Sequence, residues 1–131
     1  MKRIESIRNI RSKLKGGKIS VGSWMQLSNN SVAEVMGKAG YDWITIDMEH
    51  GAFDFSEIPD LCRAIELGGT LPLIRLLDGN PARCKQALDA GAGGVIIPMI
   101  NSAEDLKEIR DYCYWPPKGK RGVGFSRANL F

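Results

Sequence analysis

The sequence has 131 residues, of which 44% are hydrophobic and 25% charged, and its formal net charge is +3. This composition is ordinary for one globular domain and excludes a disordered chain. Because the sequence contains no apolar run of membrane-spanning length and no secretory leader, we expect a cytoplasmic protein without a membrane partner.

The basic charge is concentrated in residues 1–18, which hold seven basic residues and one acidic residue. Within this segment, Ile and Leu residues recur at helical spacing, which predicts a helix over 2–15 that ends at Gly16-Gly17. A basic segment is also typical of proteins that bind nucleic acid, but no aromatic residue is interleaved with these charges. A solvated amphipathic helix is therefore the favoured interpretation, and no nucleic-acid partner is expected.

Short apolar strands then alternate with helical patterns along the chain. Asn80 and Ser102 precede two of the helical patterns as capping residues, and glycines follow several of them. In chain order the predicted elements are strand 19–27, helix 31–40, strand 41–48, helix 55–69, strand 71–76, helix 80–91, strand 93–100, helix 102–115 and a basic, glycine-rich loop over 118–131.

This alternation predicts an α/β fold with a parallel sheet that is buried on both faces. We expect one domain over 1–131, with an N-terminal helix in 1–17 and four β/α units and the basic loop in 18–131. A doubly wound open sheet and a TIM barrel both fit the pattern. No G-x-G-x-x-G follows the first strand, which weakens the dinucleotide-binding version, whereas a barrel needs eight units and only four are present.

The stretch ITIDMEHG ends a predicted strand in Asp47, Glu49 and His50, and His50 is the only histidine of the protein. Asp47 and Glu49 alternate with Met48 and so point to one side of the strand. A histidine beside a carboxylate is a candidate general base, because the carboxylate orients the imidazole. A metal site made from these three residues alone is less favoured, since no other ligand is near in the sequence.

Three further residues are candidates for the site. Arg75 ends the next strand, where its guanidinium could bind a carboxylate or phosphate, and an ion pair with Asp47 or Glu49 is an equally supported alternative. Asp89 lies near the C-terminus of a predicted helix, where the helix dipole disfavours an acid, so a compensating partner is expected. Arg121 belongs to the basic loop, which is a weak candidate for anion binding.

The three cysteines, Cys62, Cys84 and Cys113, are odd in number and include no C-x-x-C pair. This pattern argues against a disulfide framework and against a structural zinc site. Buried free thiols are expected for at least Cys62 and Cys84.

The motifs D-x-E-H-G, P-x-x-R, L-D-x-G-x-x-G and P-P-x-G-x-R-G occur in one order along the chain. In this order and spacing, the sequence resembles the HpcH/HpaI aldolases over about residues 5–131. The resemblance implies a (β/α)₈ barrel of the TIM type, of which this chain holds about the first four β/α units after an N-terminal helix. It also implies a metal-dependent carbon–carbon lyase that cleaves 4-hydroxy-2-oxo acids to pyruvate and an aldehyde.

Site roles follow from the same resemblance. His50 matches the base that moves the C4 hydroxyl proton. Arg75 matches the residue that stabilises the pyruvate enolate and carboxylate. Asp89 matches the acid that raises the basicity of the histidine, often across a subunit contact. Asp47 and Glu49 match acids that support the site, and Arg121 belongs to a matching loop. A small 2-oxo acid or aldehyde substrate and a homo-oligomer are implied.

The resemblance implies a divalent cation, Mg²⁺ or Mn²⁺, whose ligands follow the fifth and sixth strands of the family. Those strands have no counterpart in this sequence, so no metal ligand is expected in this chain and it is predicted to be inactive alone. A truncated gene, a split protein or a partial record would each give such a chain. The alternative is a non-catalytic half-barrel that self-associates or pairs with a separately encoded second half.

Overall fold

Four parallel strands form one sheet in the order β1-β2-β3-β4, so each strand pairs with the next along the chain. The computed structural model describes residues 2–129, and within them one edge of β1 and one edge of β4 have no partner strand. The strands are β1 (Gly22–Met25), β2 (Trp43–Asp47), β3 (Leu71–Arg75) and β4 (Gly94–Ile96).

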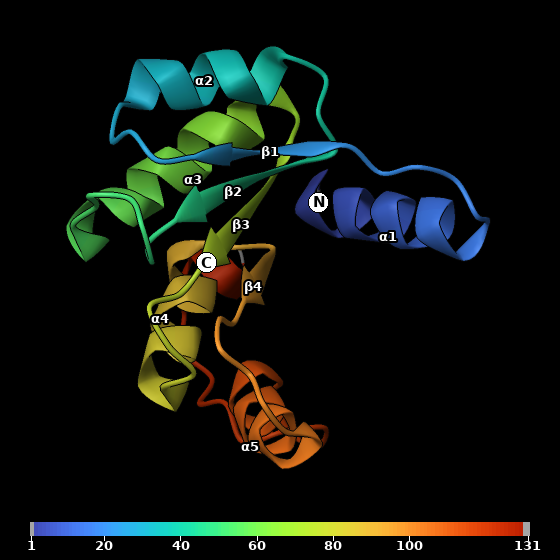
Figure 1. The fold of residues 1–131 in the computed structure, drawn as a ribbon, viewed down its shortest axis with the longest axis vertical. Helices are drawn as coiled ribbons and strands as arrows, with labels where there is room; N and C mark the ends of the chain where they lie inside the picture. The colour runs from blue at the N-terminus through green and yellow to red at the C-terminus, as the bar shows by residue number, and fades with distance from the viewer. Residues whose placement is uncertain (1, 130–131) are drawn as a thin grey trace.

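A helix precedes the sheet and one helix follows each strand (Figure 1). In Figure 1, α2 and α3 cover the sheet near β1 and β2, while α4 and α5 lie at the β4 end. The helices are α1 (Lys2–Lys15), α2 (Asn30–Lys38), α3 (Ile58–Gly68), α4 (Pro81–Ala90) and α5 (Ala103–Cys113), with short 3₁₀ turns at Phe55–Glu57 and Arg127–Asn129.

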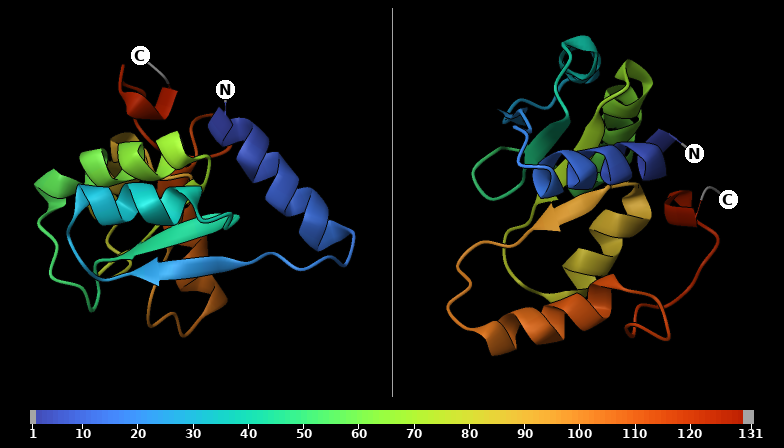
Figure 2. Two further views of the ribbon diagram at one scale, coloured as in Figure 1. Left: turned by 90° about the horizontal axis from the view of Figure 1, so that it is seen from above. Right: turned by 90° about the vertical axis from the view of Figure 1, so that its right-hand side faces the viewer.

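The two ends of the described chain lie side by side in both views of Figure 2. Arg3 in α1 donates a hydrogen bond to the backbone carbonyl of Arg127 over 3.3 Å. Both arginines also pair with Glu66 of α3. The N-terminal helix is therefore attached to the end of the described chain through one shared carboxylate.

The core lies between the sheet and helices α2, α3 and α4. Ile44 and Ile46 of β2 are fully buried and belong to the same cluster as Leu61 and Ile65 of α3. Side chains alternate along a strand, so Thr45 and Asp47 point to the other face of the sheet. This alternation places apolar residues under the helices and frees the opposite face for polar side chains.

Helix α2 approaches α3 closely because both helices present glycine at the contact. A Cβ atom on Gly68 would lie 2.3 Å from the backbone of Gly37, a separation that real Cβ atoms do not reach. Val32, Val35 and Met36 have the spacing of one apolar face of α2, but Val35 is 70% exposed. Ala33 and Gly37 are the buried residues instead, because the close approach of the helices selects small residues.

The predicted order and type of the elements are confirmed, but several boundaries differ. Strands β1 and β4 are four and three residues long, shorter than the predicted runs. Asp54, in a capping box with Glu57, begins the segment that leads into α3. Residue 1 and residues 130–131 of the predicted domain and loop lie outside the described residues.

The N-terminal helix forms as predicted, but its apolar stripe is only partly covered. Ile4 and Leu14 are 50% and 59% exposed, whereas Ile7 and Ile10 are half-buried. Across residues 2–129, no helix combines the length and the apolar character needed to cross a membrane.

Candidate functional site

Asp47 and Arg75 lie beside each other because β2 and β3 are parallel and in register. Asp47 is the last residue of β2, Arg75 is the last residue of β3, and the two are direct partners across the sheet. In parallel α/β folds, reactive side chains collect at this carboxyl edge, where strand ends and the following loops meet. The site therefore begins with a carboxylate and a guanidinium placed by strand register.

The Asp47 carboxylate is fully buried and accepts hydrogen bonds on both oxygens. Arg75 donates through Nε over 2.8 Å and through a terminal nitrogen over 2.6 Å, a two-point pairing that fixes the guanidinium plane. The backbone N–H groups of Glu49 and His50 donate to Oδ1, each over 3.2 Å. Asp47 thus holds both Arg75 and the turn that carries the histidine.

Hydrogen bonds from Arg75 hold the pKa of the Asp47 carboxyl well below its usual range, with smaller contributions from Gln26 and the His50 amide. Burial acts in the opposite direction but does not outweigh these donors. Asp47 is consequently a fixed negative charge whose oxygens are already occupied. It cannot act as a proton donor or acceptor near neutral pH.

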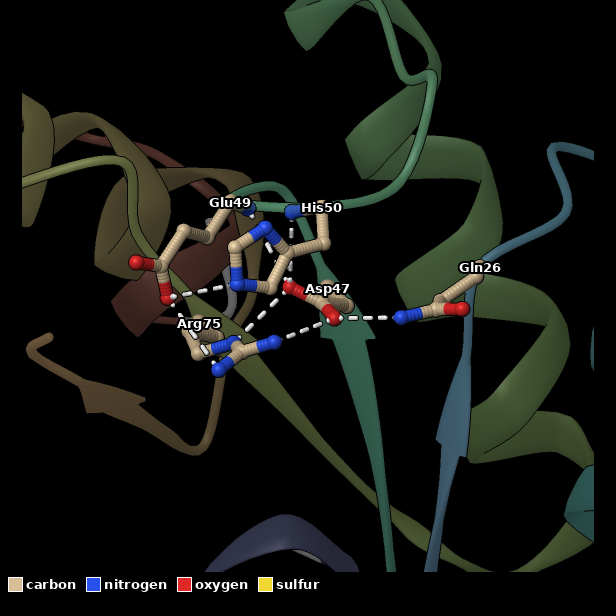
Figure 3. A network of polar contacts seen from close by, with 5 residues as sticks. All are labelled: Gln26, Asp47, Glu49, His50 and Arg75. Atoms are coloured by element: carbon tan, nitrogen blue, oxygen red, sulfur yellow. Dashed lines mark hydrogen bonds and ion pairs between the residues drawn. The ribbon is translucent and has the colours of Figure 1, made fainter.

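Glu49 and His50 supply the groups that remain available for chemistry. Figure 3 shows the Arg75 guanidinium between the Asp47 and Glu49 carboxylates, with the His50 imidazole beside Glu49. The Glu49 carboxylate lies 3.1 Å from Arg75 and 3.8 Å from His50 Nε2. The His50 side chain is 63% exposed, so a small molecule in solvent can reach its ring.

Two residues of this cluster, Gln26 and Trp24, are not among those predicted from the sequence. Gln26, directly after β1, donates a hydrogen bond to Asp47 Oδ2 over 2.8 Å. Trp24 of β1 lies under Arg75, with its ring centre 4.7 Å from the guanidinium carbon. A polar residue at the end of the first strand was the available signal for Gln26, since all parallel strands end at this edge.

The residues of this cluster do not form a metal site by themselves. Within residues 2–129, no three His, Cys, Asp or Glu side chains gather closely enough to hold a metal ion. The chemistry of the donors agrees, because the oxygens of Asp47 already accept hydrogen bonds from Arg75 and Gln26. A divalent cation needs several free oxygen ligands, so the cluster does not fit one.

Asp89 and Arg121 lie together at a different part of the fold. Asp89 is next to the last residue of α4, which leads into the start of β4, so it lies toward the sheet edge opposite His50. Arg121 pairs with Asp89 over 2.5 Å, is only 6% exposed and stacks 4.8 Å from the ring centre of Trp115. The compensating partner expected for Asp89 is therefore Arg121, and within one chain neither residue joins the cluster of His50.

Comparison with known proteins finds similarity to aldolases. The family model described as HpcH/HpaI aldolase/citrate lyase matches residues 20–130. A hydroxypyruvate/pyruvate aldolase of Roseobacter denitrificans is 36% identical over 127 residues, which are 95% of this chain and 50% of that protein. A 2-keto-3-deoxy-L-rhamnonate aldolase of Salmonella gallinarum is 36% identical over 115 residues, which are 88% of this chain and 43% of that protein.

The fold matches a solved structure over the same extent. The HpcH/HpaI aldolase of Desulfitobacterium hafniense superposes with a TM-score of 0.83 at 35% identity, covering 92% of this chain and 47% of that one. The chain thus spans about half the length of the curated relatives it matches. The helix and four β/α units correspond to part of the barrel of that family.

Proposed function

The chain belongs to the HpcH/HpaI aldolase/citrate lyase family, and on this basis we propose that it supplies the proton-handling residues of an aldolase. The proposed reaction cleaves a 4-hydroxy-2-oxo acid to pyruvate and an aldehyde. The observation that carries the proposal is the cluster of Asp47, Glu49, His50 and Arg75 at the carboxyl edge of the sheet. Similarity to aldolases acting on hydroxypyruvate, pyruvate and 2-keto-3-deoxy-L-rhamnonate supports the substrate class.

In this proposal His50 takes the proton of the C4 hydroxyl as the bond between C3 and C4 breaks. Its exposed ring suits a group that must meet the substrate, and the Glu49 carboxylate lies 3.8 Å from its Nε2. The electron pair of the broken bond passes to the pyruvate fragment as an enolate. Arg75 is the fixed cation that stabilises this developing charge, and Asp47 holds its guanidinium in place.

The family resemblance also brings a divalent cation, but these residues do not fit one. No role in metal binding is therefore assigned to Asp47, Glu49 or His50. We propose that the ligands belong to polypeptide outside this chain, and that the chain has no aldolase activity alone.

Asp89 enters the proposal only through a second copy of the chain. It lies toward the opposite edge of the sheet from His50, so one chain cannot bring the two together. A homo-oligomer in which Asp89 of one copy approaches His50 of another would reconcile the placement with the role that the resemblance implies. The double variant His50→Cys, Asp89→Cys, made in a chain whose own cysteines are replaced by serine, tests this contact, since an intermolecular disulfide between the two positions requires it.

The proposal is tested by completing the barrel. The chain is co-expressed with the second half of the Roseobacter denitrificans aldolase, and pyruvate release from 4-hydroxy-2-oxo acids is followed by a coupled dehydrogenase assay. We expect release by the assembled pair, none by the chain alone with Mg²⁺ or Mn²⁺, and a loss of about 10²–10⁴-fold in His50→Gln. The variant Arg75→Met is measured in the same assay. Its matched control is Arg83→Met, because Arg83 pairs with an acid on the surface.

Three results would contradict it. Pyruvate release by the chain alone would overturn the prediction that it is inactive without a second half. Full activity of His50→Gln in the assembled pair would exclude His50 as the base. An assembled, folded pair that cleaves no 4-hydroxy-2-oxo acid would remove the proposed reaction.

A second candidate is a non-catalytic half-barrel that pairs with itself or with another half. It is favoured by the edges of β1 and β4 that no strand within residues 2–129 covers, and by the apolar side chains exposed near β1, namely Ile19, Val21, Trp24 and Leu27. Exposed apolar strand edges associate readily. Light scattering on the purified chain discriminates, because a monodisperse monomer at high concentration argues against self-pairing.

A further inference from the structure

Gln26, directly after β1, holds the Asp47 carboxylate from the side opposite Arg75. Its Nε2 donates to Asp47 Oδ2 over 2.8 Å, and Figure 3 shows Gln26 and Arg75 on the two sides of that carboxylate. Although Gln26 is exposed, its amide reaches a side chain that is fully buried. The bond joins the end of β1 to the end of β2, at the edge where the candidate site lies.

The hydrogen-bond donors to Asp47 come from three directions. Arg75 of β3 donates to both oxygens, and the amides of Glu49 and His50 donate to Oδ1 from the turn after β2. Among the described residues, Gln26 is the only donor from the β1 side, and it shares Oδ2 with Arg75. Without Gln26, Oδ2 keeps a single donor from the described chain, and the carboxylate is no longer held from its β1 side.

We propose that Gln26 is a positioning residue for the aldolase reaction: it holds the Asp47 carboxylate in the plane that pairs with Arg75, and so fixes the guanidinium that faces the enolate. The inference rests on the proposed function, because that function assigns Arg75 the task of stabilising the enolate. Gln26 acts through Asp47, and no contact with substrate is assigned to it.

The guanidinium of Arg75 needs to be held because a second carboxylate is within its reach. Glu49 lies 3.1 Å from a terminal nitrogen of Arg75, whose side chain is 22% exposed. The two-point pairing with Asp47 fixes the guanidinium plane only while both carboxylate oxygens stay in place. Rotation of the carboxylate about its last side-chain bond, a torsion with a broad preference, would let Arg75 turn toward Glu49. The hydrogen bond from Gln26 opposes that rotation.

The remaining contacts of β1 agree with this role. The hydrogen bond from Gln26 adds to the larger effect of Arg75 in lowering the pKa of the Asp47 carboxyl, so it helps to keep this residue ionised. Trp24, two residues earlier and on the same side of the strand, lies with its ring centre 4.7 Å from the guanidinium carbon. Strand β1 and the residue after it thus contact both members of the ion pair.

The first test measures the Arg75 side chain directly and needs no catalytic activity. In the full chain with isotopically labelled arginine, the NMR signal of the Arg75 Nε–H, which donates to Asp47 Oδ1, is assigned by its absence in Arg75→Met. We expect this proton to exchange with water about tenfold faster in Gln26→Leu than in the wild type, since one hydrogen bond to the charged carboxylate is lost. The Nε–H of Arg3, which donates to Glu66, is the internal control and should exchange equally fast in both chains.

The second test compares variants of Gln26 in the pair assembled with the second half of the aldolase. Gln26→Glu keeps the shape of the side chain but replaces the donor with an acceptor beside Asp47, whereas Gln26→His changes the shape but keeps an N–H donor of similar reach. We expect kcat to fall about tenfold in Gln26→Leu and further in Gln26→Glu, with a smaller change in KM, and to fall least in Gln26→His. A merely structural side chain gives the reverse order, because glutamate matches glutamine most closely in shape.

Gln86→Glu is the matched control for Gln26→Glu. Gln86 is exposed on α4 and makes no hydrogen bond through its side chain within the described residues, so the same substitution there should leave kcat unchanged.

The two tests separate the role of Gln26 from the proposed reaction. Equal exchange of the Arg75 proton in the wild type and Gln26→Leu overturns the role of Gln26, and so does an active pair in which Gln26→Glu is as fast as the wild type. A wild-type pair that releases no pyruvate, together with faster Arg75 exchange in Gln26→Leu, contradicts the proposed reaction but supports the role of Gln26 in holding Arg75.

Discussion

Replacing Asp47 with Asn tests whether one buried carboxylate holds the candidate site together. The substitution keeps the shape of the side chain but removes its charge and turns one acceptor oxygen into a donor group. Asp47 accepts hydrogen bonds from Gln26, Arg75 and the amides of Glu49 and His50. In either orientation of the new amide, its NH₂ group faces hydrogen-bond donors that face an acceptor oxygen in the wild type.

The expected cost follows from the burial of Asp47. Removing one partner of a buried ion pair costs about 3–5 kcal/mol, because the remaining charge loses its compensation. Glu49 stays 3.1 Å from Arg75 and retains part of that compensation, which places the expected loss near the lower end, about 3 kcal/mol. A domain of this size has a free energy of unfolding of only about 5–15 kcal/mol, so the effect is easily measured.

Urea unfolding followed by tryptophan fluorescence and far-ultraviolet circular dichroism measures the loss. The control is Asp60→Asn, which breaks an exposed pair with Arg63 one helical turn away and is expected to change the free energy of unfolding by less than about 0.5 kcal/mol. A loss below about 1 kcal/mol in Asp47→Asn, or one equal to the control, would refute the reasoning. Arg75→Met should also cost less when Asp47→Asn is already present than in the wild type, since the two substitutions break one interaction.

Further predictions concern acid and packing. The carboxyl of Asp47 has a lowered pKa in the folded chain, so its contribution to the free energy of unfolding is fully present above about pH 4–5. This contribution is lost as the pH falls through the folded-state pKa. Asp47→Asn should therefore flatten this part of a profile of unfolding free energy against pH. Gly68→Ala should cost about 1–3 kcal/mol in urea unfolding because its Cβ would meet Gly37, whereas Gly124→Ala, with open space around it in the described chain, should cost far less.

The sequence was sufficient for the order of the elements and for the edge at which the site lies. Hydrophobic periodicity and capping residues located each helix, and strand alternation correctly placed Asp47 and Glu49 on one side. The partner of Arg75 could not be chosen from the sequence, because an ion pair and a substrate contact require the same residue type. The register of β2 with β3 decides it, and register depends on the whole sheet.

Other features were hidden for related reasons. Val35 has the spacing of a core residue, but the glycine contact between α2 and α3 turns it to solvent. Asp89 and Arg121 share no motif, and only the packing of the basic loop on α4 brings their side chains together. Each of these features depends on a contact between elements, whereas periodicity and capping report on one element at a time.

The charge of the site limits what these residues can do without added groups. Asp47 and Glu49 both lie against Arg75, so two carboxylates and one guanidinium carry a formal net charge of −1. Such a group repels the carboxylate of a 2-oxo acid more than it attracts it, even though its arginine is suited to bind one. Because Asp47 is buried and remains ionised, protonation of this residue near neutral pH cannot relieve the repulsion. We therefore expect Arg75 to stabilise an enolate only where further positive charge, such as the divalent cation that the family resemblance implies, would offset this repulsion.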